Sequence, residues 1–277
     1  MELKFCSLFS GSSGNALYAR SGNTHLLIDA GVSGTKVVRE LEKIGVSPGD
    51  LSAILITHEH ADHIAGVGVL SRRYNLPVYA NEATWEAMRP KLGSIAPGNV
   101  RCFESGTDFY IEDVNVLPFR TPHDAAEPVG FSLMAGQCKL TIATDLGAIK
   151  ESWLRHAERS DLLLLESNHD VGMLKSGRYP YELKRRILGK NGHLSNDDAG
   201  RAAVELVRSG VRALILGHLS GENNFPELAY RSVACALEQA GIRPEEVQLA
   251  VASRESHGPM FIASDEGDVY QEESGHV

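Results

Sequence analysis

Short apolar runs rich in β-branched residues recur along the chain. Each run has the length of a single strand, and we interpret each one as a strand. The predicted strands cover residues 24–29, 53–57, 77–80, 114–119, 139–143, 162–166, 213–217 and 248–252.

Helix-like stretches lie between several of these runs, and Ser, Asp or Pro in capping positions introduces some of them. The predicted helices cover residues 35–44, 62–74, 82–88, 195–209 and 226–240. This alternation predicts a mixed α/β fold. No Pro/Ser-rich linker or low-complexity tract divides the chain, so we expect one domain over residues 1–277, with two β-rich halves that meet near residues 145–160. The residues after about Asp268 are expected to be frayed.

The composition is typical of a soluble globular protein, with 43% apolar and 23% charged residues. The N-terminus has no basic region followed by a long apolar run, and no stretch of about 18 apolar residues occurs. We therefore expect a cytoplasmic protein that does not bind a membrane. The four cysteines are spread singly, which predicts reduced and mostly buried thiols. They are Cys6, Cys102, Cys138 and Cys235.

The formal net charge of −9 argues against a surface that coats nucleic acid generally, because affinity for phosphate backbones comes from clustered Lys and Arg. Any basic site must therefore be local. One such segment is residues 175–190, where six cations stand against the single acid Glu182. The cations are Lys175, Arg178, Lys184, Arg185, Arg186 and Lys190. Beside an active site they could hold phosphates, and a solvated helix face is the alternative.

The densest chemical signal is an H-x-H-x-D-H run between a predicted strand and a predicted helix. It places four potential metal ligands within six residues: His58, His60, Asp62 and His63. They can all point inward only if the backbone bends through a loop, and the helix would then begin near Asp62. Imidazole and carboxylate ligands suit Zn, Mn or Fe, and two adjacent pairs suggest two neighbouring ions. The alternative is a solvated loop that is rich in His by chance.

This run, together with the aspartate-ending strand at residues 26–31, resembles the metallo-β-lactamase-fold hydrolase superfamily. The resemblance implies a four-layer αββα sandwich with a dinuclear site at the edge between two sheets. It also implies that Asp29 stabilises the metal loop from behind and does not bind metal. Later segments supply the remaining family ligands, namely His123, Asp145 in a T-D-x-G signature, and His218.

The resemblance also implies how the ligands divide between two divalent ions. Ion one would be held by His58, His60, His123 and Asp145, and ion two by Asp62, His63, Asp145 and His218. Taken singly, His123 and His218 would be ordinary polar or core histidines. Oxygen-reducing diiron relatives carry Glu at the position of His60, so hydrolysis by a metal-activated hydroxide is favoured here.

Two further segments, at residues 162–170 and 192–196, resemble those that phosphodiesterase members of the superfamily place beside the metals. By that resemblance Glu166 orients His193, and His193 protonates the leaving alkoxide, so the predicted catalytic residues are Asp62, His193 and Glu166. An alkoxide is a poor leaving group near neutral pH and gains from such an acid. The alternative for His193 is a plain residue before a helix that Ser195 caps.

From about Leu3 to Ala263 the chain is similar to one bacterial subfamily, the WalJ (YycJ) metallo-hydrolases. The matching segments are residues 10–15, 166–170, 192–196 and 217–224. The subfamily is associated with 5′-to-3′ exonuclease activity on DNA and is close to cyclic-phosphate phosphodiesterases. By this resemblance residues 10–15 form a tight loop near the site, although a plain β-turn is equally consistent with them.

Three functions remain open on the sequence alone. The first is a phosphodiesterase with DNA as its substrate, and it needs no obligate protein partner. The second is a small-molecule hydrolase acting on a cyclic nucleotide, a phosphoribosyl cyclic phosphate or, with less support, a thioester. The third is a nonenzymatic scaffold, which would have no need of seven ligands. His169 is open as a substrate contact, an alternate ligand or an ordinary buried histidine.

Overall fold

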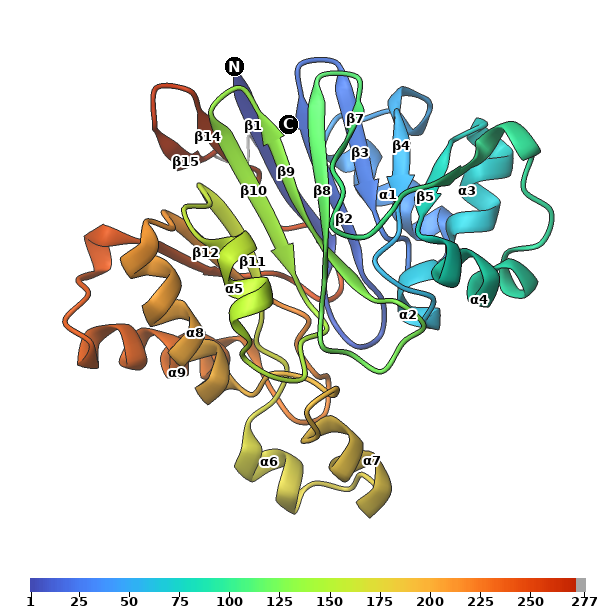
Figure 1. Cartoon of the computed structure of the whole chain (residues 1–277). Helices are drawn as coiled ribbons and strands as arrows, with labels where there is room; N and C mark the ends of the chain where they lie inside the picture. The colour runs from blue at the N-terminus through green and yellow to red at the C-terminus, as the bar shows by residue number, and fades with distance from the viewer. Residues whose placement is uncertain (273–277) are drawn as a thin grey trace.

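A computed structural model describes residues 1–272 and shows two β-sheets packed face to face between layers of helices (Figure 1). The first sheet has the order β15-β14-β1-β2-β3-β4-β5-β6. Its strands are β1 (Glu2–Phe9), β2 (Ala16–Ser21), β3 (Thr24–Ile28), β4 (Ala53–Leu55), β5 (Val78–Ala80), β6 (Val100–Cys102), β14 (Phe261–Ser264) and β15 (Val269–Gln271).

The second sheet has the order β13-β12-β11-β10-β9-β8-β7. Its strands are β7 (Phe109–Ile111), β8 (Val114–Arg120), β9 (Val129–Ala135), β10 (Cys138–Ala143), β11 (Leu162–Glu166), β12 (Ala213–Gly217) and β13 (Gln248–Val251). The pairs from β10 to β13 are parallel, and β8 runs in the same direction because β9 is antiparallel to both β8 and β10. The carboxyl ends of these strands therefore meet at one edge of the sheet.

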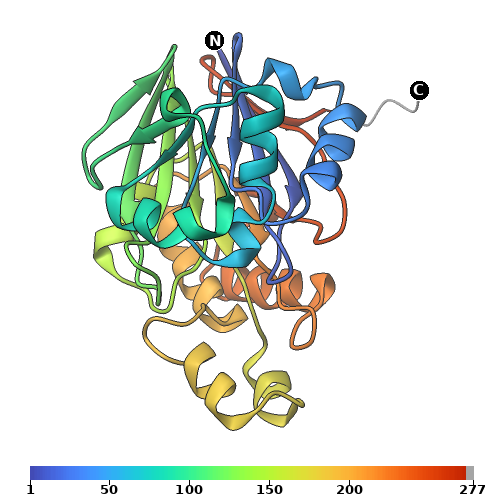
Figure 2. The ribbon, with the colours of Figure 1, turned by 90° about the vertical axis from the view of Figure 1, so that its right-hand side faces the viewer.

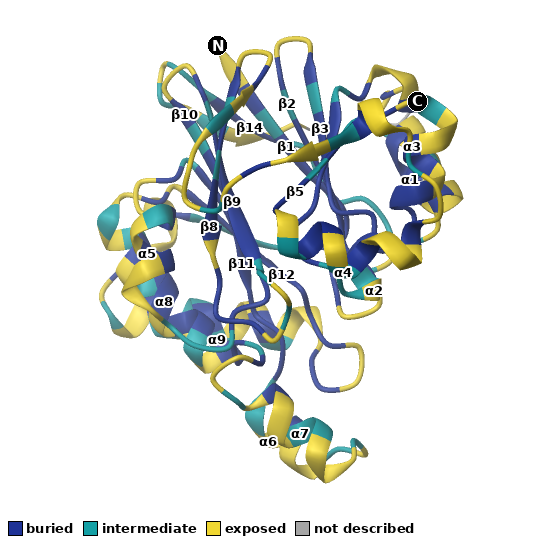
Figure 3. Cartoon of the chain, turned by 45° about the vertical axis from the view of Figure 1, so that its right-hand side comes forward, coloured by how far each residue is buried: buried dark blue, intermediate teal, exposed yellow. Residues whose placement is uncertain are grey.

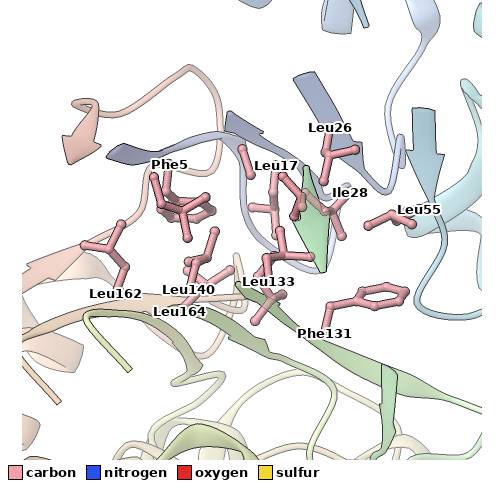
Figure 4. Close-up of a cluster of buried hydrophobic side chains, with 14 of the residues drawn as sticks. Phe5, Leu17, Leu26, Ile28, Leu55, Phe131, Leu133, Leu140, Leu162 and Leu164 are labelled. Atoms are coloured by element: carbon pink, nitrogen blue, oxygen red, sulfur yellow. The ribbon is translucent and has the colours of Figure 1, made fainter. Parts of the chain in front are cut away.

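Buried aliphatic and aromatic side chains fill the space between the two sheets (Figure 4). Phe5, Leu26 and Leu55 come from the first sheet, and Phe131 and Leu164 come from the second. Each such side chain contributes about 1.5–3 kcal/mol when it is fully removed from water, so this layer is a main source of stability. It also holds the two sheets in a constant position relative to each other at the edge where the strands end.

Helices cover the outer faces of both sheets, which completes the expected αββα sandwich (Figures 1 and 2). Those packed on the first sheet are α1 (Gly34–Lys43), α2 (Ala61–Ile64), α3 (Val67–Tyr74) and α4 (Glu82–Leu92). Those packed on the second sheet are α5 (Glu151–Ala157), α8 (Asn196–Ser209) and α9 (Pro226–Gln239). Two short helices, α6 (Val171–Ser176) and α7 (Tyr181–Ile187), project from the body. Short 3-10 turns lie at Pro48–Asp50, Pro97–Asn99 and Pro244–Glu246.

All eight predicted strands are present, each within two residues of its predicted ends. The helix predicted over residues 62–74 is instead two helices, α2 and α3. The break lies at Gly66, whose amide donates to the carbonyl of Ala30 at 2.7 Å. A Cβ on Gly66 would lie 2.5 Å from the carbonyl oxygen of Val32, so close packing against the preceding loop decides this bend.

Three other expectations differ from the structure. The chain passes to the second sheet between β6 and β7, upstream of residues 145–160, and β14 and β15 return to the first sheet. Residues 269–271, expected to be frayed, form β15 because they pair with β14, while residues 273–277 lie outside the described part. All four cysteines are free, but only Cys6 and Cys138 are buried, and Cys102 and Cys235 are exposed. The single domain over residues 1–277 remains a prediction.

Within residues 1–272, none of the helices combines the length and the apolar character needed to cross a bilayer.

Candidate metal centre and active site

Loops at the carboxyl ends of strands from both sheets converge at one edge of the sandwich. The segment after β4 supplies four of the predicted ligands, and the segments after β8, β10 and β12 supply one each. Glu166 is the last residue of β11, and His193 lies between α7 and α8. The structure brings together all nine residues predicted from the sequence, namely His58, His60, Asp62, His63, His123, Asp145, Glu166, His193 and His218.

Three residues at this edge adopt left-handed backbone conformations that L-amino acids rarely populate. Their φ angles are 60° for Asp29, 59° for Asp145 and 56° for His218. Such conformations cost on the order of 1 kcal/mol or more each and persist where surrounding contacts hold them. At His218, the amide donates to Ser10 Oγ at 2.9 Å, and the carbonyl accepts from Asn168 Nδ2 at 2.8 Å. These contacts therefore hold the backbone in the conformation that directs the side chains of these residues into the site.

One cluster of ring nitrogens lies on the side of the site nearest β8. His58 Nε2 is 3.1 Å from His60 Nδ1, and the same His60 atom is 3.3 Å from His123 Nε2. Asp145 Oδ1 is 3.5 Å from His123 Nε2. Nitrogen lone pairs at these separations repel one another unless a proton or a metal ion lies between them. The cluster is therefore built to receive a cation.

A second cluster lies beside the first and shares Asp145 with it. His63 Nε2 and His218 Nε2 are each 3.7 Å from Asp62 Oδ2. Asp145 Oδ2 is 3.5 Å from His63 Nε2, while its Oδ1 faces His123. Oδ1 is also 3.4 Å from Nδ1 of His218, so Asp145 lies between the two clusters.

The donor atoms suit a divalent metal ion. Bonds of about 2.0–2.1 Å in a tetrahedral arrangement separate neighbouring ligand atoms by about 3.3 Å, close to the distances in both clusters. Within the described residues, Asp145 Oδ2 and His218 Nε2 are also buried without a hydrogen-bond partner. Buried polar atoms normally have partners, and a metal ion would supply the missing one. The His and Asp clusters therefore indicate divalent metal binding.

Hydrogen bonds behind the clusters set the tautomers of the histidines. His63 Nδ1 donates to Asp29 Oδ2 at 2.7 Å, and His58 Nδ1 donates to Thr57 Oγ1 at 3.0 Å. Thr57 in turn donates from Oγ1 to Asp29 Oδ2 at 2.7 Å. With the proton on Nδ1, each Nε2 keeps a free lone pair for a metal. Asp29 thus supports the metal loop from behind, as expected from the sequence.

The charges of the site favour a cation between its carboxylates. Burial penalises a charged His58 ring and, with the neighbouring histidines, holds its pKa well below the ordinary value. Burial opposes charge on His63 as well, but Asp145 and Asp29 outweigh it and raise the pKa of His63 to about 9. Without a metal ion, Nε2 of His63 therefore also carries a proton, and a bound ion would replace that proton. Burial alone would raise the pKa of Asp62, but the adjacent histidines lower it below its usual range. The carboxylate of Asp62 therefore stays ionised at neutral pH.

Glu166 connects three of the loops that form the site. Its Oε2 accepts from the amides of Leu146 at 2.7 Å and Leu194 at 3.0 Å. Its Oε1 accepts from His193 Nδ1 and His218 Nδ1, each at 2.8 Å. Burial opposes ionisation, but the two imidazoles outweigh it and hold the pKa of Glu166 below the ordinary value. Glu166 is fully buried and accepts four hydrogen bonds, and two of these hold the rings of His193 and His218.

His193 lies at the rim of the site, beside two of the proposed metal ligands. Its ring centroid lies 5.0 Å from that of His123 and 5.2 Å from that of His218. Its side chain is 17% exposed, more than those of the two neighbouring rings. Because Nδ1 donates to Glu166, Nε2 is the ring nitrogen that remains available to another group.

Three further residues complete the site, and two of them, Asn15 and Asn168, lie in segments that resemble the WalJ (YycJ) subfamily. Sequence reasoning misses the third, Thr57, because a Thr beside a His-rich run carries no signal of its own. Asn15 lies in the loop at residues 10–15, and its Nδ2 is 3.3 Å from the carbonyl oxygen of Asp62 and 3.2 Å from His63 Nε2. Asn168 donates to the carbonyl of His218. The loop at residues 10–15 therefore belongs to the site and is more than a surface turn.

His169 stands outside the ligand clusters. It is buried, and neither ring nitrogen has a hydrogen-bond partner within residues 1–272. Burial lowers the pKa of His169 to about 4, so its ring is neutral at pH 7. None of the His and Asp groupings that could hold a metal in the described chain includes it, so the structure does not support an alternate ligand.

Comparison with known proteins places this site in a family. A family model described as the metallo-beta-lactamase superfamily matches residues 10–218. The chain is 42% identical over 241 residues to a Streptococcus pneumoniae protein named exodeoxyribonuclease WalJ, which covers 86% of this chain and 90% of that protein. It is also 42% identical over 241 residues to a Bacillus anthracis protein named exodeoxyribonuclease YycJ, which covers 87% and 91% of the two chains.

A solved structure supports the fold independently. The metallo-beta-lactamase fold protein YhfI from Bacillus subtilis superposes with a TM-score of 0.68 at 18% identity, over 92% of this chain and 99% of that one. At that identity the likeness concerns the fold alone. The family match and the two relatives go further, and they show that this chain belongs to the metallo-β-lactamase superfamily of metal-dependent hydrolases and, within it, to the WalJ (YycJ) subfamily.

Proposed function

We propose that this protein is a dinuclear metal-dependent phosphodiesterase that degrades DNA from the 5′ end. The observation that carries the proposal is the Glu166–His193 pair, which places a proton donor beside the metal clusters. A donor in this position serves a poor leaving group such as the alkoxide of a DNA strand. The names of the WalJ and YycJ relatives support the choice of DNA as substrate.

Two divalent ions fit the two clusters, with Asp145 between them. We propose that His58, His60 and His123 hold the first ion and that Asp62, His63 and His218 hold the second. Zn, Mn and Fe all accept this set of His and Asp ligands. Bound ions supply Lewis acidity and an activated water at neutral pH. Asp62 also has a catalytic role in this proposal, because its partly exposed carboxylate can orient that water at the mouth of the site.

Hydrolysis then consumes one water per bond. A bond forms between the water oxygen and phosphorus, and the proton that the water loses passes to solvent. The bond from phosphorus to the leaving sugar oxygen breaks, a proton from His193 Nε2 passes to that oxygen, and solvent returns a proton to His193. Ionised Glu166 stabilises the protonated imidazole through Nδ1 before the transfer. The products are a phosphate monoester and an alcohol, and the cytoplasmic location expected from the sequence is part of this proposal.

The proposal is tested with linear duplex DNA labelled at the 5′ or the 3′ end. Metal-stripped protein is supplied with Mn or Zn, beside His58→Ala and His193→Ala variants. We expect early release of short products from the 5′ label, no release by His58→Ala, and release slowed about 10²–10⁴-fold by His193→Ala. Turnover of a small cyclic diester without DNA cleavage would assign the site to a small-molecule phosphodiesterase instead.

A further inference from the structure

The helices α6 and α7 form an arm that projects from the body beside the active site (Figures 1 and 2). We define the arm as residues 171–190. Most of its surface is exposed, and only Leu174 and Ile187 are buried (Figure 3). The function of the metal centre does not by itself require such a projection.

The arm concentrates positive charge in an otherwise acidic chain. Between residues 175 and 190, six cations stand against one acid, while the whole chain has a formal net charge of −9. Within the described residues, no carboxylate lies within ion-pair distance of Lys175, Arg178 or Lys190. Arg185 faces Glu182 at 4.0 Å, but both side chains are exposed, and such pairs are weak. Several cations are therefore free to meet an anion.

The two helices of the arm are fixed to each other. Lys184 Nζ donates to the carbonyl oxygens of Lys175 at 2.8 Å and Gly177 at 2.6 Å. Asp170 caps α6 by accepting from the amide of Met173 at 2.7 Å. One cation of the segment therefore holds the arm together, while Lys175, Arg178 and Lys190 are exposed.

The base of the arm is hydrogen-bonded to two residues of the proposed active site, His193 and His123. The amide of His193 donates to the carbonyl of Ile187 at 3.0 Å, and His123 Nδ1 donates to the carbonyl of Gly192 at 3.0 Å. A Cβ on Gly192 would lie 2.2 Å from the carbonyl oxygen of Ile187, and one on Gly147 would lie 2.4 Å from the amide nitrogen of Gly192. The backbone at this junction is thus packed without spare room.

An ion pair continues the link along the rim. Arg186 pairs with Asp124 through two nitrogens, of which Nη2 lies 3.0 Å from Asp124 Oδ1. Asp124 Oδ1 is in turn 3.5 Å from His123 Nε2. The basic surface therefore begins beside a proposed metal ligand and runs outward along the arm.

The arm also presents an exposed aromatic ring. Tyr181, at the start of α7, is 72% exposed, although large aromatic side chains are usually covered. Exposed aromatic rings beside Lys and Arg are the combination by which proteins hold single-stranded nucleic acid, because bases stack on the ring while cations meet the backbone. A small-molecule substrate would make no use of a ring and cations spread along a projection.

We propose that the arm binds single-stranded DNA on its way to or from the metal centre, with Lys175, Arg178 and Lys190 on phosphates and Tyr181 stacked on a base. This inference rests on the proposed function and specifies how its substrate is held. The base of the arm is hydrogen-bonded to His193 and His123. A DNA strand held on the arm therefore lies at a constant distance from the proton donor. The contacts are to backbone and base faces, so they carry no sequence preference.

The test compares strand affinity in matched variants. The arm variant carries Lys175→Ser, Arg178→Ser and Lys190→Ser, and the control variant carries Lys36→Ser, Arg73→Ser and Arg101→Ser, three exposed cations on the first-sheet side. Binding of a 5′-phosphorylated oligothymidine of roughly 30 nucleotides is measured by fluorescence anisotropy in Mn-loaded protein carrying His193→Ala, which slows cleavage. Cleavage of DNA and of bis(p-nitrophenyl) phosphate is measured without that substitution.

We expect the arm variant to raise Kd at least tenfold and to reduce the slope of log K against log salt by about 2, since each lost contact with a single strand removes about 0.7. KM for DNA should rise with little change in kcat, while the control variant changes Kd less than twofold. Tyr181→Ala should raise Kd roughly tenfold, and Tyr181→Phe should restore it, because stacking needs only the ring.

The outcomes separate the two proposals. Wild-type affinity in the arm variant, or an equal loss in the control variant, would overturn the role of the arm while DNA cleavage by the enzyme stands. Absence of both DNA binding and DNA cleavage in the wild-type enzyme, with turnover of bis(p-nitrophenyl) phosphate retained, would overturn both.

Discussion

Replacing Glu166 by Gln removes one charge from a fully buried side chain and keeps its shape. The carboxylate accepts from two amides on one oxygen and from His193 and His218 on the other. A carboxamide has one accepting oxygen and one donating NH2 group. Whichever way it turns, its NH2 group faces either the two amides or the two imidazole N–H groups, so two hydrogen bonds are lost.

The magnitude follows from those four contacts. Hydrogen bonds to a charged group contribute about 1.5–3 kcal/mol each, so losing two costs about 3–6 kcal/mol. Glu166→Gln also removes the burial penalty of the charge, which offsets part of this loss. We therefore expect the free energy of unfolding to fall by about 3 kcal/mol. His193 would lose the acceptor that orients it, and the rate of DNA cleavage should fall about 10²–10⁴-fold.

The assay separates stability from chemistry. Urea unfolding of the metal-loaded protein gives the first quantity, with Glu86→Gln, an exposed Glu on α4, as the matched control. Cleavage of DNA and of bis(p-nitrophenyl) phosphate gives the second, because nitrophenolate leaves readily without a proton and needs His193 less. Because Glu166 also holds the proposed ligand His218, the metal content of both proteins is first shown to be equal. An unchanged unfolding midpoint, or an equal loss of rate on both substrates at equal metal content, would then refute the positioning role of Glu166.

Three further predictions concern the surroundings of the site. Asp29→Asn removes an acceptor shared by Thr57 and His63 and should weaken metal binding about 10- to 100-fold in a chelator competition; unchanged affinity would contradict the support role of Asp29. Gly147→Ala should lower the free energy of unfolding, measured with urea, by about 1–3 kcal/mol, since its Cβ would lie 2.4 Å from backbone atoms of Lys190 and Gly192. Gly98→Ala, with open space around it, should leave the free energy of unfolding unchanged, and equal effects of the two substitutions would contradict the tight junction. Burial raises the pKa of the Cys6 thiol to about 12 and that of Cys138 to about 11, so a thiol reagent at pH 8 should label Cys102 and Cys235 at once and the other two only on unfolding; rapid labelling of all four would contradict their burial.

Much of the fold could be predicted from sequence because buried strands need apolar residues wherever they lie. The run at residues 162–166 is predicted as a strand from its apolar residues alone, and it is β11 in the fold. The three-residue strands β6, β7 and β15 have no such pattern, and pairing with a neighbour defines them. The break at Gly66 depends on the carbonyl of Val32, a contact that no local pattern contains.

The site likewise combines residues that the sequence predicts with residues whose role depends on tertiary contacts. The nine predicted residues come from dense or ordered motifs, and the structure gathers all of them at one edge. Thr57, which connects His58 to Asp29, is an ordinary residue type whose role comes from its place behind the metal loop. The arm was visible in the sequence as charge alone. Its relation to His193 depends on backbone packing at Gly147 and Gly192, which only the folded chain shows.

The most direct test of the account is a metal titration that follows two quantities in the same samples. Metal-stripped protein receives increasing Mn or Zn, and bound ions per chain are measured beside the rate of release of a 5′ label from linear DNA. The account predicts no cleavage without metal and a rate that reaches its plateau at two ions per chain. Cleavage by the stripped protein, a plateau at one ion per chain, or two bound ions without any cleavage of DNA would contradict it.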